Sequence, residues 1–151
     1  MLQVKTLLCF DYGEKRIGVA VGQTLTGTAT PLGIVRVKGG KPDWSNISKL
    51  IEEWQPQALV VGKPVCMDGA RQLLTDLSEK FGRQLQGRYH LQVFFIDERL
   101  TTYEAMRRMQ SDRDLDPVAA QIILESWLAE YAHGRYPDAT ITAAKEGQGS
   151  E

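Results

Sequence analysis

The hydrophobic pattern of this 151-residue chain changes its period several times, and each change separates one structural element from the next. Three apolar runs come first, divided by turn-forming glycine and threonine clusters, which is typical of an antiparallel meander. The pattern therefore predicts three strands, over residues 4–12, 17–23 and 30–37.

The rest of the chain alternates between helical and strand periods. Apolar spacings of three and four predict three helices: one from Trp44 that Pro56 ends, one that starts near Gly69 and is marked up to Leu85, and one over residues 116–133. The capping-box spacing of Thr101 and Glu104 predicts a fourth helix, over residues 101–110. Short apolar runs predict strands at 58–61 and 91–96. This order predicts an α/β fold in which the late, helix-connected strands are parallel and the early meander contributes an antiparallel strand.

Polar residues that could take part in catalysis or ligand binding lie at the ends of these strands. Asp11 ends the first strand, a glycine-containing loop from 62 to 68 follows the fourth, and Asp97 and Glu98 follow the fifth. Ligands gather at the carboxyl ends of parallel strands in open sheets, so we expect these segments to converge. Asp116 is a third acid, although an aspartate before Pro117 is also explained as an ordinary helix cap.

Three carboxylates brought together would repel one another unless a cation lies between them. Oxygen ligands without clustered cysteine or histidine favour Mg²⁺ or Mn²⁺ over zinc. Two such ions can promote phosphodiester hydrolysis, which indicates a nuclease or a phosphotransferase. Basic residues in the same loops are candidate contacts to substrate phosphates, and they are Lys15, Arg16, Lys63 and Arg99.

Composition excludes several classes of protein. The length suits one domain, no apolar run is long enough to span a membrane, and no signal-peptide pattern opens the chain, so we expect a soluble, cytoplasmic protein. Cys9 and Cys66 are isolated, which argues against a disulfide or zinc framework. Residues 138–151 have no periodicity and are expected to be a disordered tail, which leaves 1–137 as the folded domain.

The glycines of the first hairpin do not form a nucleotide cradle. Gly13 and Gly18 have the spacing of a P-loop, but Val19 and Ala20 stand where its lysine and hydroxyl residue are required. The three tryptophans lie on apolar helix faces, so core packing explains them better than base stacking.

Four ordered blocks resemble the YqgF/RuvX family of the RNase H-like superfamily. They are residues 11–13 with 16–20, residues 62–64 with 67–69, residues 97–102, and residues 116–120 with 123–124. Two positions depart from the family pattern, Lys63 in place of leucine and Pro117 after Asp116.

The resemblance implies a mixed five-stranded sheet in the order 3-2-1-4-5, with strand 2 antiparallel, and a metal site of Asp11, Glu98 and Asp116. It also implies a nuclease of structured nucleic acid, with precursor 16S ribosomal RNA or a branched DNA (Holliday) junction as the substrate. Enzymes that cut symmetric junctions can act as homodimers, and the sequence shows no interface that would decide this.

Two hypotheses from other classes of protein stay open. The chain could be a nucleic-acid-binding or regulatory domain that has the fold without the catalysis. A metal titration would distinguish this hypothesis from a nuclease, because a domain without catalysis would bind no Mg²⁺ or Mn²⁺. The chain could also be an ATPase of the actin or sugar-kinase type, whose phosphate hairpin carries an acid and glycines. Those proteins enclose nucleotide between two copies of the fold, and this chain has room for one.

Overall fold

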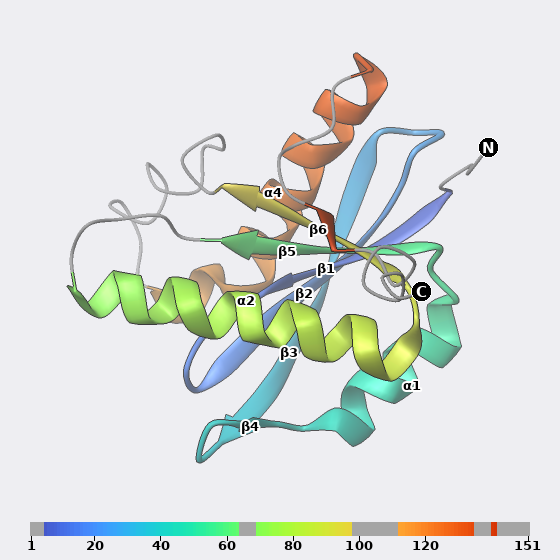
Figure 1. Ribbon diagram of the computed structural model, residues 1–151. Helices are drawn as coiled ribbons and strands as arrows, with labels where there is room; N and C mark the ends of the chain where they lie inside the picture. Colours follow the sequence, from blue (N-terminus) through green and yellow to red (C-terminus); the bar gives the residue numbers. More distant parts are fainter. Residues whose placement is uncertain (1–4, 64–68, 98–111, 135–139, 142–151) are drawn as a thin grey trace, which may run out of the picture.

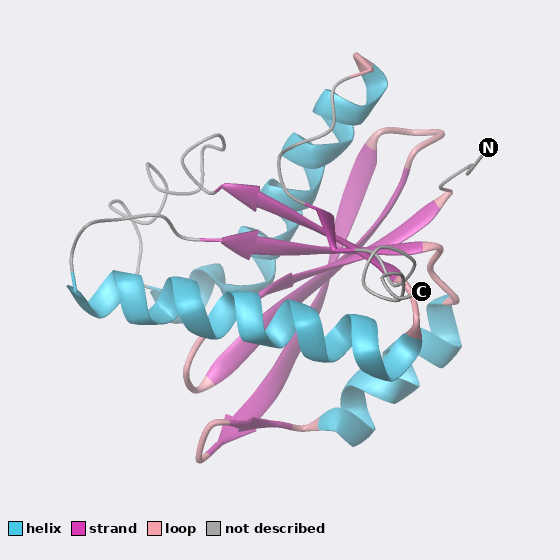
Figure 2. Ribbon diagram, in the orientation of Figure 1, coloured by secondary structure: helices cyan, strands magenta, loops and turns pink. Residues whose placement is uncertain are grey.

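The computed structural model describes residues 5–63, 69–97, 112–134 and 140–141. Within these residues, seven strands form one sheet that has helices on both faces (Figures 1 and 2). The helices are α1 (Trp44–Trp54), α2 (Gly69–Tyr89) and α4 (Asp112–Ala132). The strands are β1 (Thr6–Asp11), β2 (Arg16–Gln23), β3 (Thr28–Lys38), β4 (Lys41–Pro42), β5 (Ala58–Lys63), β6 (Gln92–Asp97) and β7 (Thr140–Ile141).

The strand order is β4-β3-β2-β1-β5-β6-β7. The strands β1, β2 and β3 form an antiparallel meander, whereas β5 pairs in parallel with both β1 and β6. The five predicted strands therefore occupy the predicted order, with the second antiparallel to its neighbours. As a result, the carboxyl ends of β1, β5 and β6 lie at the same edge of the sheet (Figure 1).

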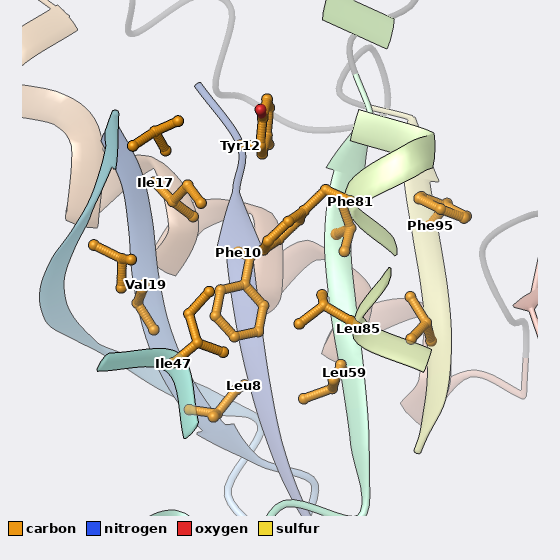
Figure 3. Close-up of a cluster of buried hydrophobic side chains, with 14 of the residues drawn as sticks. Leu8, Phe10, Tyr12, Ile17, Val19, Ile47, Leu59, Phe81, Leu85 and Phe95 are labelled. Carbon is orange, nitrogen blue, oxygen red and sulfur yellow. The ribbon is translucent and has the colours of Figure 1, made fainter. Parts of the chain in front are cut away.

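Alternate residues of each strand point to opposite faces of the sheet and build two apolar layers. On one face, which we call the α4 face, the first layer packs against α4 through residues such as Leu7, Cys9 and Trp127. On the other, the α1–α2 face, the second layer packs against α1 and α2 through residues such as Phe10 and Phe81 (Figure 3). Every side chain near a strand end can therefore be assigned to one of these faces.

Local chemistry explains why these segments fold as they do. Asp43 caps α1 by accepting a hydrogen bond from the backbone nitrogen of Asn46 at 3.3 Å, and Gln55 ends the helix in the left-handed conformation before Pro56. On the other face of the sheet, α4 approaches β2 closely at Gly22. A Cβ atom at this glycine would lie 2.7 Å from a methyl carbon of Leu124.

Two strands were not predicted from the sequence. Strand β4 returns along β3 through Gly39 and Gly40, whose φ angles of 57° and 76° suit a tight hairpin turn. The other strand, β7, pairs antiparallel with β6 and lies within residues 138–151, the segment predicted to be disordered. None of the helices in the described ranges is long and apolar enough to span a membrane.

The start of α4 corrects another prediction. The sequence predicts a helix that begins at Asp116, capped by this residue, whereas α4 begins four residues earlier at Asp112. Pro117 consequently lies inside the helix, where it cannot donate a backbone hydrogen bond. Asp116 is therefore not the cap of this helix, and capping no longer explains the residue. The predicted helix over 101–110 lies outside the described residues.

Candidate active site at the carboxyl ends of the strands

Asp11 is a buried carboxylate at the last position of β1. Only 8% of the residue is exposed to solvent. Leu7 and Cys9 precede it at alternate positions and belong to the α4 layer, so Asp11 faces α4 as well. A charged group held at this depth is costly unless it is paired or binds a cation, which makes Asp11 the centre of the candidate site.

The turn after Asp11 is fixed by close backbone packing. A Cβ atom at Gly13 would lie 2.5 Å from the carbonyl oxygen of Arg16, so any larger residue would force the backbone of this turn to shift. The carbonyl oxygen of Lys15 accepts a hydrogen bond of 3.0 Å from the backbone nitrogen of Val37 in β3. The turn is thus tied to a third strand, and it holds Asp11 and the two predicted phosphate contacts Lys15 and Arg16 on a rigid support.

Arg16 lies on the same face of the sheet as Asp11. Asp11 is paired with Gly18, two residues after Arg16 along β2, which makes Asp11 and Arg16 diagonal neighbours. Ile17 points to the α1–α2 layer, so Arg16 points to the α4 face. The structure therefore brings together one predicted metal ligand and one predicted phosphate contact.

The helix that carries Asp116 is held against the sheet by two polar side chains. The amide of Gln121 donates to the carbonyl oxygen of Ala29 at 3.2 Å, and the carboxylate of Glu125 accepts from the backbone nitrogen of Ala29 at 3.3 Å. Together with the close approach at Gly22, these bonds fix the position of α4 on the face to which Asp11 points. The backbone of Asp116 belongs to this helix.

Lys63 points to the other face of the sheet. Its ammonium group lies 3.2 Å from the carboxylate of Glu79 in α2 and 5.7 Å from the ring centre of Phe95. Asp97 is directly opposite Lys63 in the register and faces the same way. Lys63 thus forms an ion pair on the α1–α2 side, and its predicted contact with a phosphate remains a prediction.

Glu98 and Arg99 lie outside the described residues, as does most of the loop that follows β5. The described residues alone contain no group of three side chains that could hold a metal ion. Asp11 nevertheless fits such a site, because a buried carboxylate oxygen at a strand end is a ligand that Mg²⁺ and Mn²⁺ prefer.

Tyr12 follows Asp11 and points to the opposite layer. Its ring packs on Phe81 (Figure 3), and the two ring centres lie 5.1 Å apart. Burial, with a smaller contribution from the charge of Glu14, raises the pKa of the Tyr12 hydroxyl above its usual value. The phenol therefore remains neutral at physiological pH.

This raised pKa predicts a loss of stability in alkali. Above about pH 10 an unfolded tyrosine releases its proton while the folded Tyr12 keeps it, so rising pH favours the unfolded chain. We expect the free energy of unfolding to fall more steeply between about pH 9 and pH 11 in the wild type than in Tyr12→Phe. Urea titrations at several pH values measure this difference, and equal slopes would contradict the prediction.

The sheet and the site together define a class of protein. A mixed sheet in this order, with a buried acid at the end of its first strand, is an RNase H-like fold. A solved structure of T. thermophilus RuvC in complex with a Holliday junction substrate shares this fold, with a TM-score of 0.63 and 12% sequence identity over 87% of this chain and 98% of that chain.

The chain belongs to the RuvX family, which is described as Holliday junction resolvase and matches residues 5–130. A relative from Hydrogenovibrio crunogenus is 55% identical over 120 residues, covering 79% of this chain and 90% of the relative. Another from Pseudomonas paraeruginosa is 49% identical over 136 residues, covering 85% of this chain and 94% of the relative. Both relatives carry the name "Putative pre-16S rRNA nuclease". Membership makes the chain a nuclease, a hydrolase of phosphodiester bonds in nucleic acid.

Proposed function

We propose that this protein is a metal-dependent nuclease that processes precursor 16S ribosomal RNA in the cytoplasm. The observation that carries the proposal is the buried carboxylate of Asp11, which faces α4 beside Arg16 at the edge where the parallel strands end. The names of the relatives support the choice of substrate.

In this proposal Asp11, Glu98 and Asp116 hold Mg²⁺ or Mn²⁺. Asp11 would hold the ions from the rigid end of β1, Glu98 would hold one of them and orient the attacking water, and Asp116 would contribute from α4. The chemistry that the ions supply is activation of water and neutralisation of charge on the leaving oxygen. Asp97 is not chosen as a ligand, because it faces the α1–α2 side, opposite Asp11.

Substrate phosphates are bound by Lys15 and Arg16 on the hairpin, by Lys63 at the end of β5 and by Arg99 after β6. Arg16 has the best support, because it lies on the same face as Asp11. For Lys63, binding a phosphate requires its ammonium group to leave Glu79.

A branched DNA junction is the second candidate substrate. The family description and the fold shared with a resolvase favour it. Resolution of a symmetric junction needs two cuts related by symmetry, so this candidate also calls for a homodimer.

Cleavage of two labelled substrates tests these proposals. The first is a precursor 16S RNA fragment that includes a mature end, and the second is a four-way DNA junction, each with Mg²⁺, with Mn²⁺ or with EDTA. We expect metal-dependent cutting of the RNA. Cutting of the junction alone would select the second candidate. Absence of cutting, together with no metal binding by calorimetry and intact RNA binding, would show a non-catalytic binding domain.

A further inference from the structure

We infer that the β3–β4 hairpin carries a binding track for the phosphodiester backbone of the substrate, beyond the phosphate contacts proposed above. The track consists of three cations, Arg36, Lys38 and Lys41. It continues from Arg16, so it begins beside Asp11 and runs across the sheet to its β4 edge. This inference rests on the proposed function, because it assigns a surface to the nucleic acid that flanks the cut bond.

The alternation of β3 places the cations on the α4 face. Val35 and Val37 are buried in the layer under α1 and α2, so Arg36 and Lys38 point to the opposite side, where both are exposed. Strand β4 follows the same pattern, since Pro42 is buried opposite Val37 while Lys41 is exposed opposite Lys38. The cations therefore share the face that contains Asp11 and Arg16.

The register sets like charges directly against each other. Arg16 is paired with Arg36 in neighbouring strands, and Lys38 is paired with Lys41. Like charges in directly opposed positions destabilise a sheet. A protein that keeps two such pairs side by side loses stability in the free state and regains it when a polyanion binds, which is the expected design of a phosphate-binding surface.

No described acid neutralises the track. Arg36, Lys38 and Lys41 form no ion pair within the described part of the chain, whereas Lys63 on the opposite face is paired with Glu79. The acid nearest in sequence is Asp43, which accepts a hydrogen bond from the N-terminus of α1. The three cations are thus available to an external anion.

The dimensions of the track suit a nucleic acid duplex. Neighbouring strands are about 4.8 Å apart, so the two steps from Arg16 in β2 to Lys41 in β4 span about 10 Å. That length corresponds to about three phosphates of one duplex strand, counted along the helix axis at about 3.4 Å each. Backbone contacts of this kind fix position without reading the bases, so the track would orient the substrate over Asp11.

The test uses a triple variant, which we call the track variant, that combines Arg36→Gln, Lys38→Gln and Lys41→Gln. Fluorescence anisotropy measures its binding to a 24-base-pair duplex in EDTA at several KCl concentrations. The duplex is made once as RNA and once as DNA. We expect at least about tenfold weaker binding at 100 mM KCl and a salt slope that is smaller by two to three, because each phosphate contact contributes about 0.9. If the variant binds only one of the two duplexes more weakly, the track is assigned to that nucleic acid.

A matched control removes the same charge from the other face. Lys49→Gln with Lys80→Gln and Arg83→Gln neutralises three exposed cations of α1 and α2. We expect this control to keep the wild-type salt slope. Equal losses in the two triple variants, or wild-type binding by the track variant, would overturn the inference. Binding of the wild type to anionic vesicles but to neither duplex would overturn it as well.

The outcome is separable from the proposed nuclease activity. The Asp11→Asn variant keeps all three cations and is expected to bind duplex with the wild-type salt slope. If the wild type cuts neither substrate while the track variant loses binding, the proposed function fails and the track stands. Melting temperatures show that a loss of binding is not a loss of fold, since removal of opposed like charges should not lower them.

Discussion

Replacement of Asp11 by asparagine is expected to reduce nuclease activity at least about 100-fold while the protein remains folded. The side chains are nearly isosteric, so the change removes a charge from the end of β1 and leaves the packing of the α4 face intact. Loss of an outer-shell partner of a metal site costs about 10-fold to 100-fold, and loss of a direct ligand should cost no less than the upper value. The measurement is the single-turnover cleavage rate of the precursor RNA fragment in Mg²⁺.

Glu14→Gln is the matched control for this variant. Glu14 lies three residues further along the same hairpin, and it is exposed where Asp11 is buried. We expect the control to cut at about the wild-type rate, and calorimetry to show weaker Mn²⁺ binding only in the Asp11 variant. Equal cleavage by wild type and Asp11→Asn would mean that Asp11 is not a catalytic residue.

Replacement of Trp127 by alanine is expected to cause the largest loss of stability, about 3 to 5 kcal/mol. Trp127 is fully buried in α4, and its ring lies 5.0 Å from the ring centre of Phe94 and 5.2 Å from that of Tyr131. Truncation leaves a cavity between α4 and the sheet that neighbouring residues cannot fill. Urea unfolding monitored by circular dichroism measures the change.

Trp54→Ala provides the comparison. Trp54 is the last residue of α1 and is only partly buried, so its truncation should cost clearly less than that of Trp127. Similar losses for the two variants would contradict the assignment of Trp127 to the core. If Trp127→Ala instead lost nucleic-acid binding at unchanged stability, the ring would be a stacking platform and not a packing residue.

Much of the fold is predictable from the sequence, because the period of the apolar pattern follows directly from strand and helix geometry. Five strands and the helices α1 and α2 lie where this pattern places them. The predicted start of α4 was wrong. Proline is common in the first helical turn, so Pro117 indicated a helix that begins at Asp116, whereas α4 accommodates Pro117 in its interior. Strand β4 has a signal in Gly39 and Gly40, whereas the partner of β7 is distant in the chain and leaves no local pattern.

The site is predictable to a lesser degree. The position of Asp11 at the end of a buried strand is visible in the sequence, but the face to which a residue points depends on register. Lys63 and Asp97 illustrate this, since both stand at the ends of the right strands and yet point to the α1–α2 face. Arg36 shows the converse, because only the pairing with Arg16 reveals its place beside the site.

The two hydrogen bonds that Ala29 makes with α4 also limit the pairing of other protein chains with the edge of the sheet. Strand β3 is paired with β4 only through its last two residues, so most of its outer edge could accept a foreign strand. Gln121 and Glu125 occupy the backbone nitrogen and oxygen of Ala29, and Pro31 lacks a backbone N–H group. The helix that carries Asp116 therefore also protects this part of the sheet from edge-to-edge aggregation.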